Sequence, residues 1–179
     1  AALKAARWGD VVILTKKHRA ESSTNRAQGG LASVMDPGDS FDLHVEDTLK
    51  AGAGLCRREA VEHVVREGPG LVRELVEWGV RFTRAGQGEF DLGQEGGHSR
   101  RRIVHAKDLT GREIERALLV AVEENPRIRL LENHFGLDLW VGMGSRGRRR
   151  CYGATFFVPP TGQLGLVRAR RTVLATGGL

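Results

Sequence analysis

The sequence contains no long apolar run: no stretch of about 18 consecutive apolar residues occurs among its 179 residues. We therefore expect no helical membrane span and no membrane partner. Residues 1–7 lack the apolar core of a secretory signal peptide, so a cytoplasmic setting is the default expectation.

Cysteine is scarce too. Cys56 and Cys151 are the only two, and they lie far apart without the spacing of a metal site. Such a pair is typical of reduced core or surface thiols rather than of a disulfide framework, and we expect no bound metal.

Aromatic residues are few, at 6%, whereas Lys and Arg number 28 and give a net charge of +6. That charge permits nucleic-acid binding. However, only five of the basic residues are Lys, and the Arg residues are scattered. No aromatic side chains interleave with their densest clusters, 100–102 and 148–150, as a platform for single strands requires. We predict no nucleic-acid partner; an arginine-rich nucleic-acid binder is the disfavoured alternative.

The residues that are present indicate an α/β chain. Residues 1–6 are typical of the last turns of a helix, and a tight turn at 8–10 leads to Val-Val-Ile-Leu at 11–14. A short apolar run without alternation suits a strand that is covered on both faces, as in a parallel sheet. We infer that the chain begins inside a βαβ unit whose first strand is missing.

Two helix starts carry capping signals. Asp39 or Ser40 can cap a helix over 41–49. Thr-Gly-Arg-Glu at 110–113 matches a capping box, in which the Thr hydroxyl and the Glu carboxylate accept hydrogen bonds from backbone amides of the first turn. Apolar residues at helical spacing follow it over 114–122.

Between these helices, Gly68-Pro69 predicts a break that separates a helix at 60–65 from another at 71–76, because proline lacks the amide hydrogen that a helix interior needs. After them, β-branched and aromatic runs predict short strands. The expected strands cover residues 128–131, 137–141, 152–158, 164–168 and, finally, 172–175.

This order of elements indicates a nucleotide-binding α/β domain over 1–179, with a parallel sheet, helices and an antiparallel β-meander. In such a fold the ligand lies at the carboxyl ends of the parallel strands. Three segments reach that edge: those after Leu14 and Leu131, and the one at 175–178.

One polar loop, at 94–102, places Glu95 beside two glycines and follows it with His98 and three arginines. Glycine lets the backbone approach a ligand closely, arginine grips carboxylate or phosphate, and Glu95 supplies the opposite charge. The pattern is typical of a binding site for a small polar molecule; a solvated glycine-rich turn is the alternative.

Five collinear segments carry a family resemblance: TNRAQGGLA at 24–32, HVEDTLKAGAGLC at 44–56, EGGHS at 95–99, TGRE at 110–113 and ATGG at 175–178. Together they resemble the L-aspartate oxidases, in the flavoprotein family of succinate dehydrogenase and fumarate reductase. The resemblance implies an FAD enzyme that oxidises L-aspartate to iminoaspartate in de novo NAD biosynthesis. Hydride would pass to flavin N5, with oxygen or fumarate as electron acceptor. Quinolinate synthase is a further partner that it suggests.

The resemblance also implies a Rossmann-like FAD-binding domain and assigns positions that contact FAD. Phe135 and Gly136 match the adenine end, although Phe135 alone is more typical of a core residue. The other positions are Lys16, Ser23, Thr24, Asn25, Arg26, Ala27, Gln28, Gly29, Gly30, Thr176 and Gly177. Small side chains and backbone amides there allow close approach to a flavin and its phosphates.

Two positions distinguish members of the family. Succinate dehydrogenases bind FAD covalently through a histidine at the position of Ser23, so the resemblance implies non-covalent FAD. Glu95 stands where dicarboxylate reductases usually have an apolar or amide side chain, and it is implied to orient the substrate by pairing with its ammonium group. His98 can hydrogen-bond within the same loop or serve as a structural histidine. The arginines at 100–102 are assigned no more than support.

The family's phosphate-binding Gly-x-Gly-x-x-Gly turn and its capping domain, which supplies a proton-transferring arginine and substrate-gripping histidines, have no counterpart among these residues. We therefore expect an incomplete FAD-binding domain from inside a longer flavoenzyme, which by itself binds FAD weakly and is inactive. A fumarate reductase or succinate dehydrogenase flavoprotein, and a non-catalytic nucleotide-binding module, are the alternatives to the oxidase.

Overall fold

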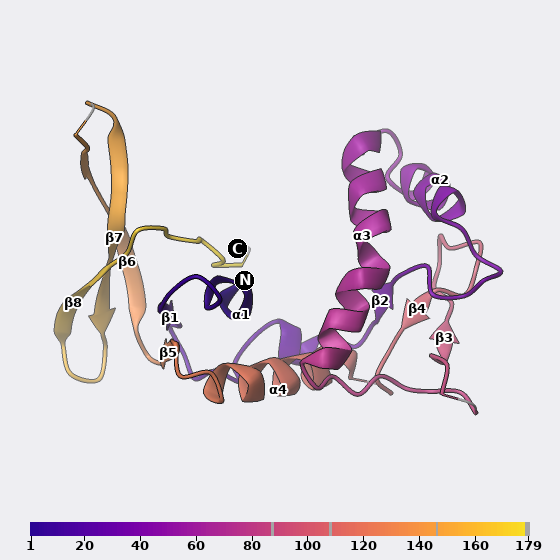
Figure 1. Cartoon of the computed structure of the whole chain (residues 1–179), viewed down its shortest axis with the longest axis horizontal. Coiled ribbons are helices and arrows are strands. Elements are labelled where there is room, and N and C mark those ends of the chain that lie inside the picture. Colours follow the sequence, from indigo (N-terminus) through magenta and orange to yellow (C-terminus); the bar gives the residue numbers. More distant parts are fainter. Residues whose placement is uncertain (87, 108, 146, 178–179) are drawn as a thin grey trace. The chain divides into compact units, whose positions relative to one another are not determined.

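The computed structural model describes residues 1–86, 88–107, 109–145 and 147–177. The chain divides into two compact units. Unit 1 comprises residues 1–21 and 122–179, and unit 2 comprises residues 22–121. Figure 1 labels the helices and strands of both. Among the described residues, no helix is both long enough and apolar enough to cross a membrane.

A parallel pair of strands begins unit 1. The short helix α1 (Ala2–Ala5) and a turn lead to β1 (Val11–Leu14), which pairs in parallel with β5 (Ile128–Leu131). The register runs from Val11 opposite Ile128 to Leu14 opposite Leu131. The unalternating apolar run is therefore a strand of a parallel sheet, as expected.

An antiparallel meander completes the sheets of unit 1. It consists of β6 (Phe135–Met143), β7 (Arg149–Val158) and β8 (Gln163–Arg168), with β7 in the centre. Figure 1 shows it in orange and yellow. The register between β6 and β7 shifts twice along β6, which marks β-bulges. The three strands predicted for the meander are confirmed, and each is longer in the structure.

The prediction of a strand at 172–175 is wrong. The structure assigns neither strand nor helix there, and Val173 and Leu174 are 71% and 67% exposed. A strand needs a neighbour that satisfies its backbone amides and carbonyls. A β-branched composition does not by itself provide that neighbour.

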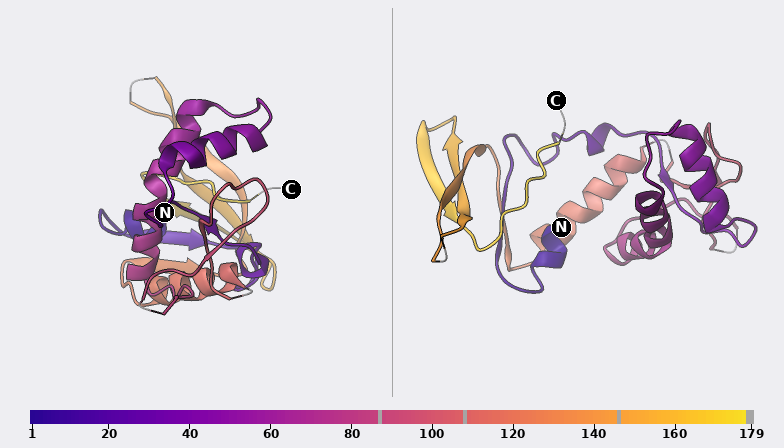
Figure 2. Two further views of the ribbon diagram at one scale, coloured as in Figure 1. Left: turned by 90° about the vertical axis from the view of Figure 1, so that its right-hand side faces the viewer. Right: turned by 90° about the horizontal axis from the view of Figure 1, so that it is seen from above.

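Unit 2 combines two packed helices with a small sheet. β2 (Leu31–Ala32), β4 (Ile103–Val104) and β3 (Leu92–Gly93) are antiparallel, and β4 lies in the centre. The helix α2 (Phe41–Ala51) packs on α3 (Arg58–Glu77), and Figure 2 shows the two in further views.

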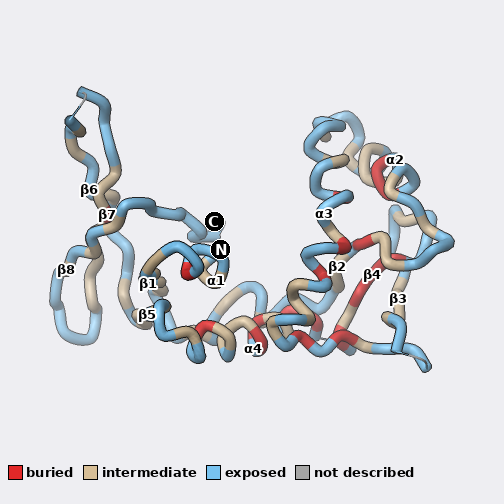
Figure 3. The backbone as a smooth tube through the Cα atoms, in the orientation of Figure 1, coloured by how far each residue is buried: buried red, intermediate tan, exposed pale blue. Residues whose placement is uncertain are grey.

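The hydrophobic core lies in unit 2. Val104 of β4 is fully buried, and Val72 of α3, Phe82 and Ala117 pack around it. Ala117 belongs to α4 (Thr110–Glu123), the helix at whose C-terminal end unit 2 passes into unit 1. Figure 3 shows these buried segments in red along β4 and α4. This core fixes the sheet formed by β2, β4 and β3.

The break predicted at Gly68-Pro69 is wrong, because α3 runs through it as one helix of 20 residues. The buried residues of α3 are Val65, Pro69 and Val72, whose spacing of four and three places them on one helical stripe. Burial of that continuous stripe outweighs the hydrogen bond that Pro69 cannot donate.

The cap of α2 is Ser40, the second of the two predicted candidates. Its Oγ accepts a hydrogen bond from the Leu43 amide at 3.2 Å. This bond satisfies one of the amides that the first turn of a helix leaves without a partner.

The helix after residue 110 is confirmed as α4, but the capping box is wrong. Thr110 lies inside the helix, and its hydroxyl accepts from the Ala106 amide at 3.1 Å. Glu113 accepts from the Arg81 amide at 2.9 Å and pairs with Arg116 at 2.7 Å. Both side chains are therefore engaged by groups outside the predicted motif.

Candidate functional site

The loop that carries Glu95 is closed at its base by the small sheet of unit 2. Gly93 of β3 pairs with Ile103 of β4, and the Arg102 amide donates to the Gly93 carbonyl at 3.1 Å. Within the loop the His98 amide donates to the Glu95 carbonyl at 3.3 Å, and Gly97 has φ +85°, a conformation that favours glycine. Residues 94–101, which we call the Glu95 loop, therefore project from a fixed hairpin.

Glu95 lies beside the predicted cofactor segment. Its Oε1 atom is 3.5 Å from the position that a Cβ on Gly29 would occupy. Both residues are exposed, and Gly29 places no side chain against the carboxylate. Within unit 2 the structure thus brings the predicted substrate residue and the predicted FAD-binding segment together.

The segment from Ser23 to Gly30 packs tightly against α4 and β4. A Cβ on Gly111 would overlap the Thr24 carbonyl oxygen, and the Gly111 amide donates to the Ala27 carbonyl at 3.1 Å. A Cβ on Gly30 would lie 2.5 Å from the Val104 carbonyl oxygen. These contacts fix the backbone of the segment while most of its residues stay exposed, namely Ser23, Thr24, Arg26, Ala27, Gln28 and Gly29.

The exposed groups of this segment fit FAD chemically. Ser23 and Thr24 carry hydroxyls, Gln28 an amide and Arg26 a guanidinium, so the segment offers neutral donors and one positive charge. Gly29 leaves the backbone beside them unobstructed apart from Glu95. Such a set suits a cofactor that combines polar ring atoms with phosphates.

The remaining cofactor positions lie in unit 1. At the carboxyl end of the β1–β5 pair, the Thr15 amide donates to the Leu131 carbonyl at 3.0 Å and the His134 amide to the Thr15 carbonyl at 2.9 Å. These bonds place Lys16 next to the residues that lead into β6. Phe135 is 46% exposed, so its alternative assignment to a core is wrong.

All these unit 1 positions are accessible. Lys16 and Gly136 are exposed, as are Thr176 and Gly177, and Gly177 has φ +77°. The predicted cofactor positions therefore fall into two exposed groups, one in each unit.

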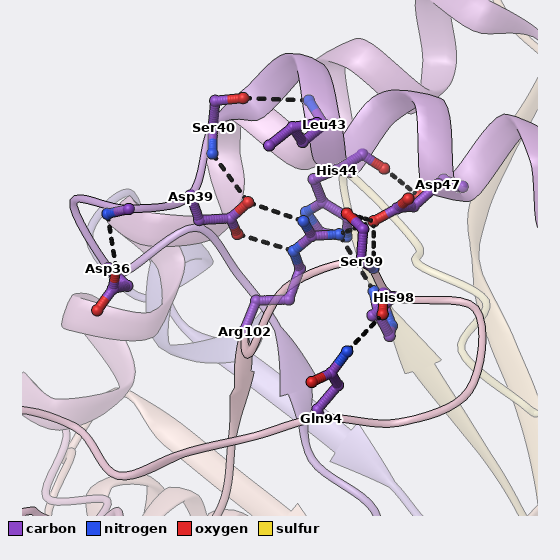
Figure 4. Close-up of polar contacts among 12 residues, drawn as sticks. Asp36, Asp39, Ser40, Leu43, His44, Asp47, Gln94, His98, Ser99 and Arg102 are labelled. Carbon is purple, nitrogen blue, oxygen red and sulfur yellow. Dashed lines mark hydrogen bonds and ion pairs between the residues drawn. The ribbon is translucent and has the colours of Figure 1, made fainter.

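Arg102 is the residue whose importance the sequence did not reveal. It is the largest fully buried side chain among the described residues, at 0% exposure. Its Nε and Nη2 atoms donate to the two carboxylate oxygens of Asp39 at 2.8 and 2.7 Å, and Nη1 donates to Asp47 at 2.6 Å. Figure 4 shows the guanidinium between the two carboxylates. An arginine buried in this way cannot grip a ligand.

The same group holds the Glu95 loop. Asp47 Oδ2 accepts from both the amide and the hydroxyl of Ser99, each at 2.8 Å, and Arg102 Nη1 lies 3.3 Å from His98 Nδ1. We call these five residues, Arg102, Asp39, Asp47, His98 and Ser99, the Arg102 cluster. The ring of His98 thus contacts Arg102, just beyond the end of the loop.

Electrostatics keep the cluster charged. Burial by itself would raise the pKa of Asp47, but hydrogen bonds from Ser99 and Arg102 outweigh burial and lower that pKa to about 2. For Asp39 burial likewise opposes ionisation, and the Arg102 hydrogen bond turns the pKa shift downward. The pKa of Arg102 is raised: its burial is outweighed by the two carboxylates.

His44 lies against the cluster as a neutral histidine. Burial lowers its pKa, and the positive charge of Arg102 lowers it further. Its ring meets that of His98 edge to face at a centroid distance of 5.7 Å. His44 and Asp47 sit three residues apart on α2, so they share a helix face. Two polar residues on one face of a helix, where that face is buried, indicate that a charged partner packs against it. This was the signal in the sequence that could have pointed to Arg102.

Comparison with known proteins now identifies the fold. A family model described as an FAD binding domain matches residues 1–179. The chain belongs to the FAD binding domain family. FAD is accordingly the cofactor of this domain, and the two exposed groups of residues are its candidate contacts.

The similar curated proteins are L-aspartate oxidases. The chain is 46% identical over 178 residues to L-aspartate oxidase 2-b, chloroplastic, of Nicotiana tabacum, which covers 99% of this chain and 27% of that protein. With an L-aspartate oxidase of Pseudomonas aeruginosa it shares 41% identity over 179 residues, or 94% of this chain and 33% of that protein. The chain thus spans about a quarter to a third of the length of these relatives.

A solved structure shows the wider family. A variant of E. coli quinol fumarate reductase superposes with a TM-score of 0.90 at 30% sequence identity, over 99% of this chain and 30% of that one. The expected resemblance to L-aspartate oxidases and to the fumarate reductase flavoproteins is therefore confirmed, together with the α/β fold.

Proposed function

We propose that this chain forms part of the FAD-binding domain of an L-aspartate oxidase, which converts L-aspartate to iminoaspartate. The observation that carries the proposal is Glu95, whose carboxylate lies beside Gly29 of the cofactor segment. A negative charge there suits a substrate with an ammonium group, which succinate and fumarate lack. The 46% identity to a tobacco L-aspartate oxidase supports the same substrate.

The chain's own residues orient the substrate. Bound FAD supplies the two-electron oxidation. Glu95 accepts hydrogen bonds from the substrate ammonium and so fixes the substrate Cα relative to the cofactor segment. A carboxylate beside a bound cofactor loses part of its hydration, and the ammonium provides the charge partner that it then needs.

Fumarate is the electron acceptor that we propose alongside oxygen, because the chain shares its fold and 30% of its residues with a quinol fumarate reductase. Participation in de novo NAD biosynthesis and an interaction with quinolinate synthase stay predictions. The cytoplasmic setting also stays a prediction, since the tobacco relative's name describes that protein as chloroplastic.

The test is Glu95→Gln in the native full-length protein. Loss of one charge-assisted hydrogen bond should raise the KM for L-aspartate about 10- to 100-fold. Inhibition by succinate, which has no ammonium group, should change less than about twofold. Steady-state kinetics give both values. Glu89→Gln, an exposed glutamate outside the loop, is the matched control and should leave both unchanged. An unaltered KM for L-aspartate with impaired fumarate reduction would contradict the proposal.

A further inference from the structure

The Glu95 loop has little structure of its own. Its residues 94–97 and 99–101 are exposed, and it contains two adjacent glycines, whose backbone is the most costly of all residues to order. The described bonds inside the loop are the His98 amide to the Glu95 carbonyl at 3.3 Å and Gln94 Nε2 to the His98 carbonyl at 2.8 Å. The position of Glu95 therefore depends on what holds the loop from outside.

The Arg102 cluster supplies that support at two consecutive residues. Asp47 accepts hydrogen bonds from the amide and the hydroxyl of Ser99, and Arg102 contacts the ring of His98. Asp47 belongs to α2, a helix packed on α3. Ser99 is thus joined to α2 directly, and His98 is joined to it through Arg102, which itself donates to Asp47.

The cluster is not itself a ligand site. Four hydrogen-bond contacts engage the guanidinium of Arg102, and its exposure is 0%. The Asp39 side chain is 1% exposed and that of Asp47 is 16% exposed. Because the guanidinium is fully buried, a substrate carboxylate does not reach Arg102.

Stability alone explains such a cluster poorly. Replacing buried ion pairs by apolar residues of similar volume is often neutral or stabilising, so stability does not require two buried charges and a half-buried one between the loop and the helix. Charged hydrogen bonds have a fixed geometry, so they favour a single conformation of the groups that they join. In this protein, these bonds favour one conformation of the Glu95 loop.

We propose that Arg102, acting through Asp47 and His98, is a positioning residue that sets the preference of the site for an amino dicarboxylate over a plain dicarboxylate. This inference rests on the proposed function, because it takes Glu95 as the partner of the substrate ammonium. Weakening the cluster moves Glu95 and lowers affinity for L-aspartate, while binding of succinate, which does not use Glu95, is preserved.

The kinetic test compares Arg102→Lys with Ser99→Ala in the native full-length protein. Lysine cannot form the bidentate contact to Asp39, and the KM for L-aspartate should rise about tenfold. Ser99→Ala removes one surface hydroxyl, so it keeps the fold even if Arg102→Lys does not; a rise of about threefold is expected, and Ser99→Thr should reverse it. Succinate inhibition and flavin content should change less than about twofold in each.

Val72→Ala is the control for simple destabilisation. It opens the core of unit 2 without touching the cluster, and it should leave the ratio of the L-aspartate KM to the succinate inhibition constant unchanged. If Arg102→Lys and Ser99→Ala leave that ratio unchanged as well, while Glu95→Gln raises it, the positioning inference is wrong and the proposed function stands.

A second measurement does not depend on turnover. Hydrogen exchange of the Ser99 amide, which donates to Asp47, should be at least about tenfold faster in Arg102→Lys than in the parent protein, because the open loop loses protection. Unchanged exchange overturns the inference. Faster exchange with no kinetic effect of Glu95→Gln would show that the cluster holds the loop, whereas the assigned substrate role of Glu95 fails.

Discussion

The two units of this chain are stabilised in different ways. Unit 2 has an apolar interior, in which Phe82 is 5% exposed and Val104 is fully buried. In unit 1 the buried apolar side chains among the described residues are Ala6 and Val122, whereas Leu164 of β8 is 75% exposed. The strands of unit 1 are joined by backbone pairing. The Glu95 loop therefore belongs to the unit that has the apolar interior.

The largest expected effect tests that contrast directly. Phe82→Ala should lower the free energy of unfolding by about 3–5 kcal/mol, because it leaves a cavity in the core. Leu164→Ala should change it by less than about 0.5 kcal/mol, since that side chain is already in water. Urea denaturation of the native protein, followed by circular dichroism, measures both. Equal losses for the two variants would show that the interior of unit 2 does not dominate stability.

Acid should weaken unit 2 in two steps. The folded pKa of His44 is lowered, so the unfolded state takes up a proton first and stability falls as the pH drops below the unfolded value of 6.5. The folded pKa values of Asp39 and Asp47 are lowered too, so their contribution is present above about pH 3.8 and is lost as the pH falls towards 2. For Asp47 the shift to about 2 corresponds to roughly 2 kcal/mol.

Thermal unfolding midpoints recorded from pH 7 to pH 2 would reveal both steps. His44→Gln should abolish the upper step and leave the lower one. His63→Gln, which replaces an exposed histidine on α3, should keep both. An upper step that persists in His44→Gln would assign it to another group.

A smaller loss of stability is expected in the helix that carries Asp47. Ser40→Ala removes the cap of α2 and should cost about 1 kcal/mol of unfolding free energy. Ser40→Asp should restore most of it, because a carboxylate caps a helix equally well. Denaturant midpoints of the parent protein and the two variants measure these changes. If Ser40→Asp does not restore the unfolding free energy lost in Ser40→Ala, Ser40 does not act as a cap.

Local patterns predicted most of the fold because they depend on neighbours in sequence. The strand at 11–14 and the α2 cap at Ser40 follow from runs and spacings of a few residues. The break at Pro69 failed because tertiary burial of one helical stripe overrode a local rule. The strand at 172–175 failed because pairing requires a partner that composition does not specify.

The candidate site was predictable only in part. Glu95 and the segment 23–30 were assigned through a family resemblance, and the structure places Glu95 beside Gly29 of that segment. Arg102 could not be distinguished from its neighbours at 100 and 101 by sequence. Its partners Asp39 and Asp47 lie 63 and 55 residues away, and no local periodicity encodes such a distance.

The bond between Asp47 and Arg102 also acts as a cross-link. It closes a span of 55 residues, a task for which many small proteins use a disulfide, whereas both cysteines of this chain are free. Unlike a disulfide, it forms only in the folded state and leaves the unfolded chain unrestrained. Reducing agents therefore leave the conformation of the loop unchanged. Acid opens the loop, because protonation of Asp47 weakens its bond to Arg102.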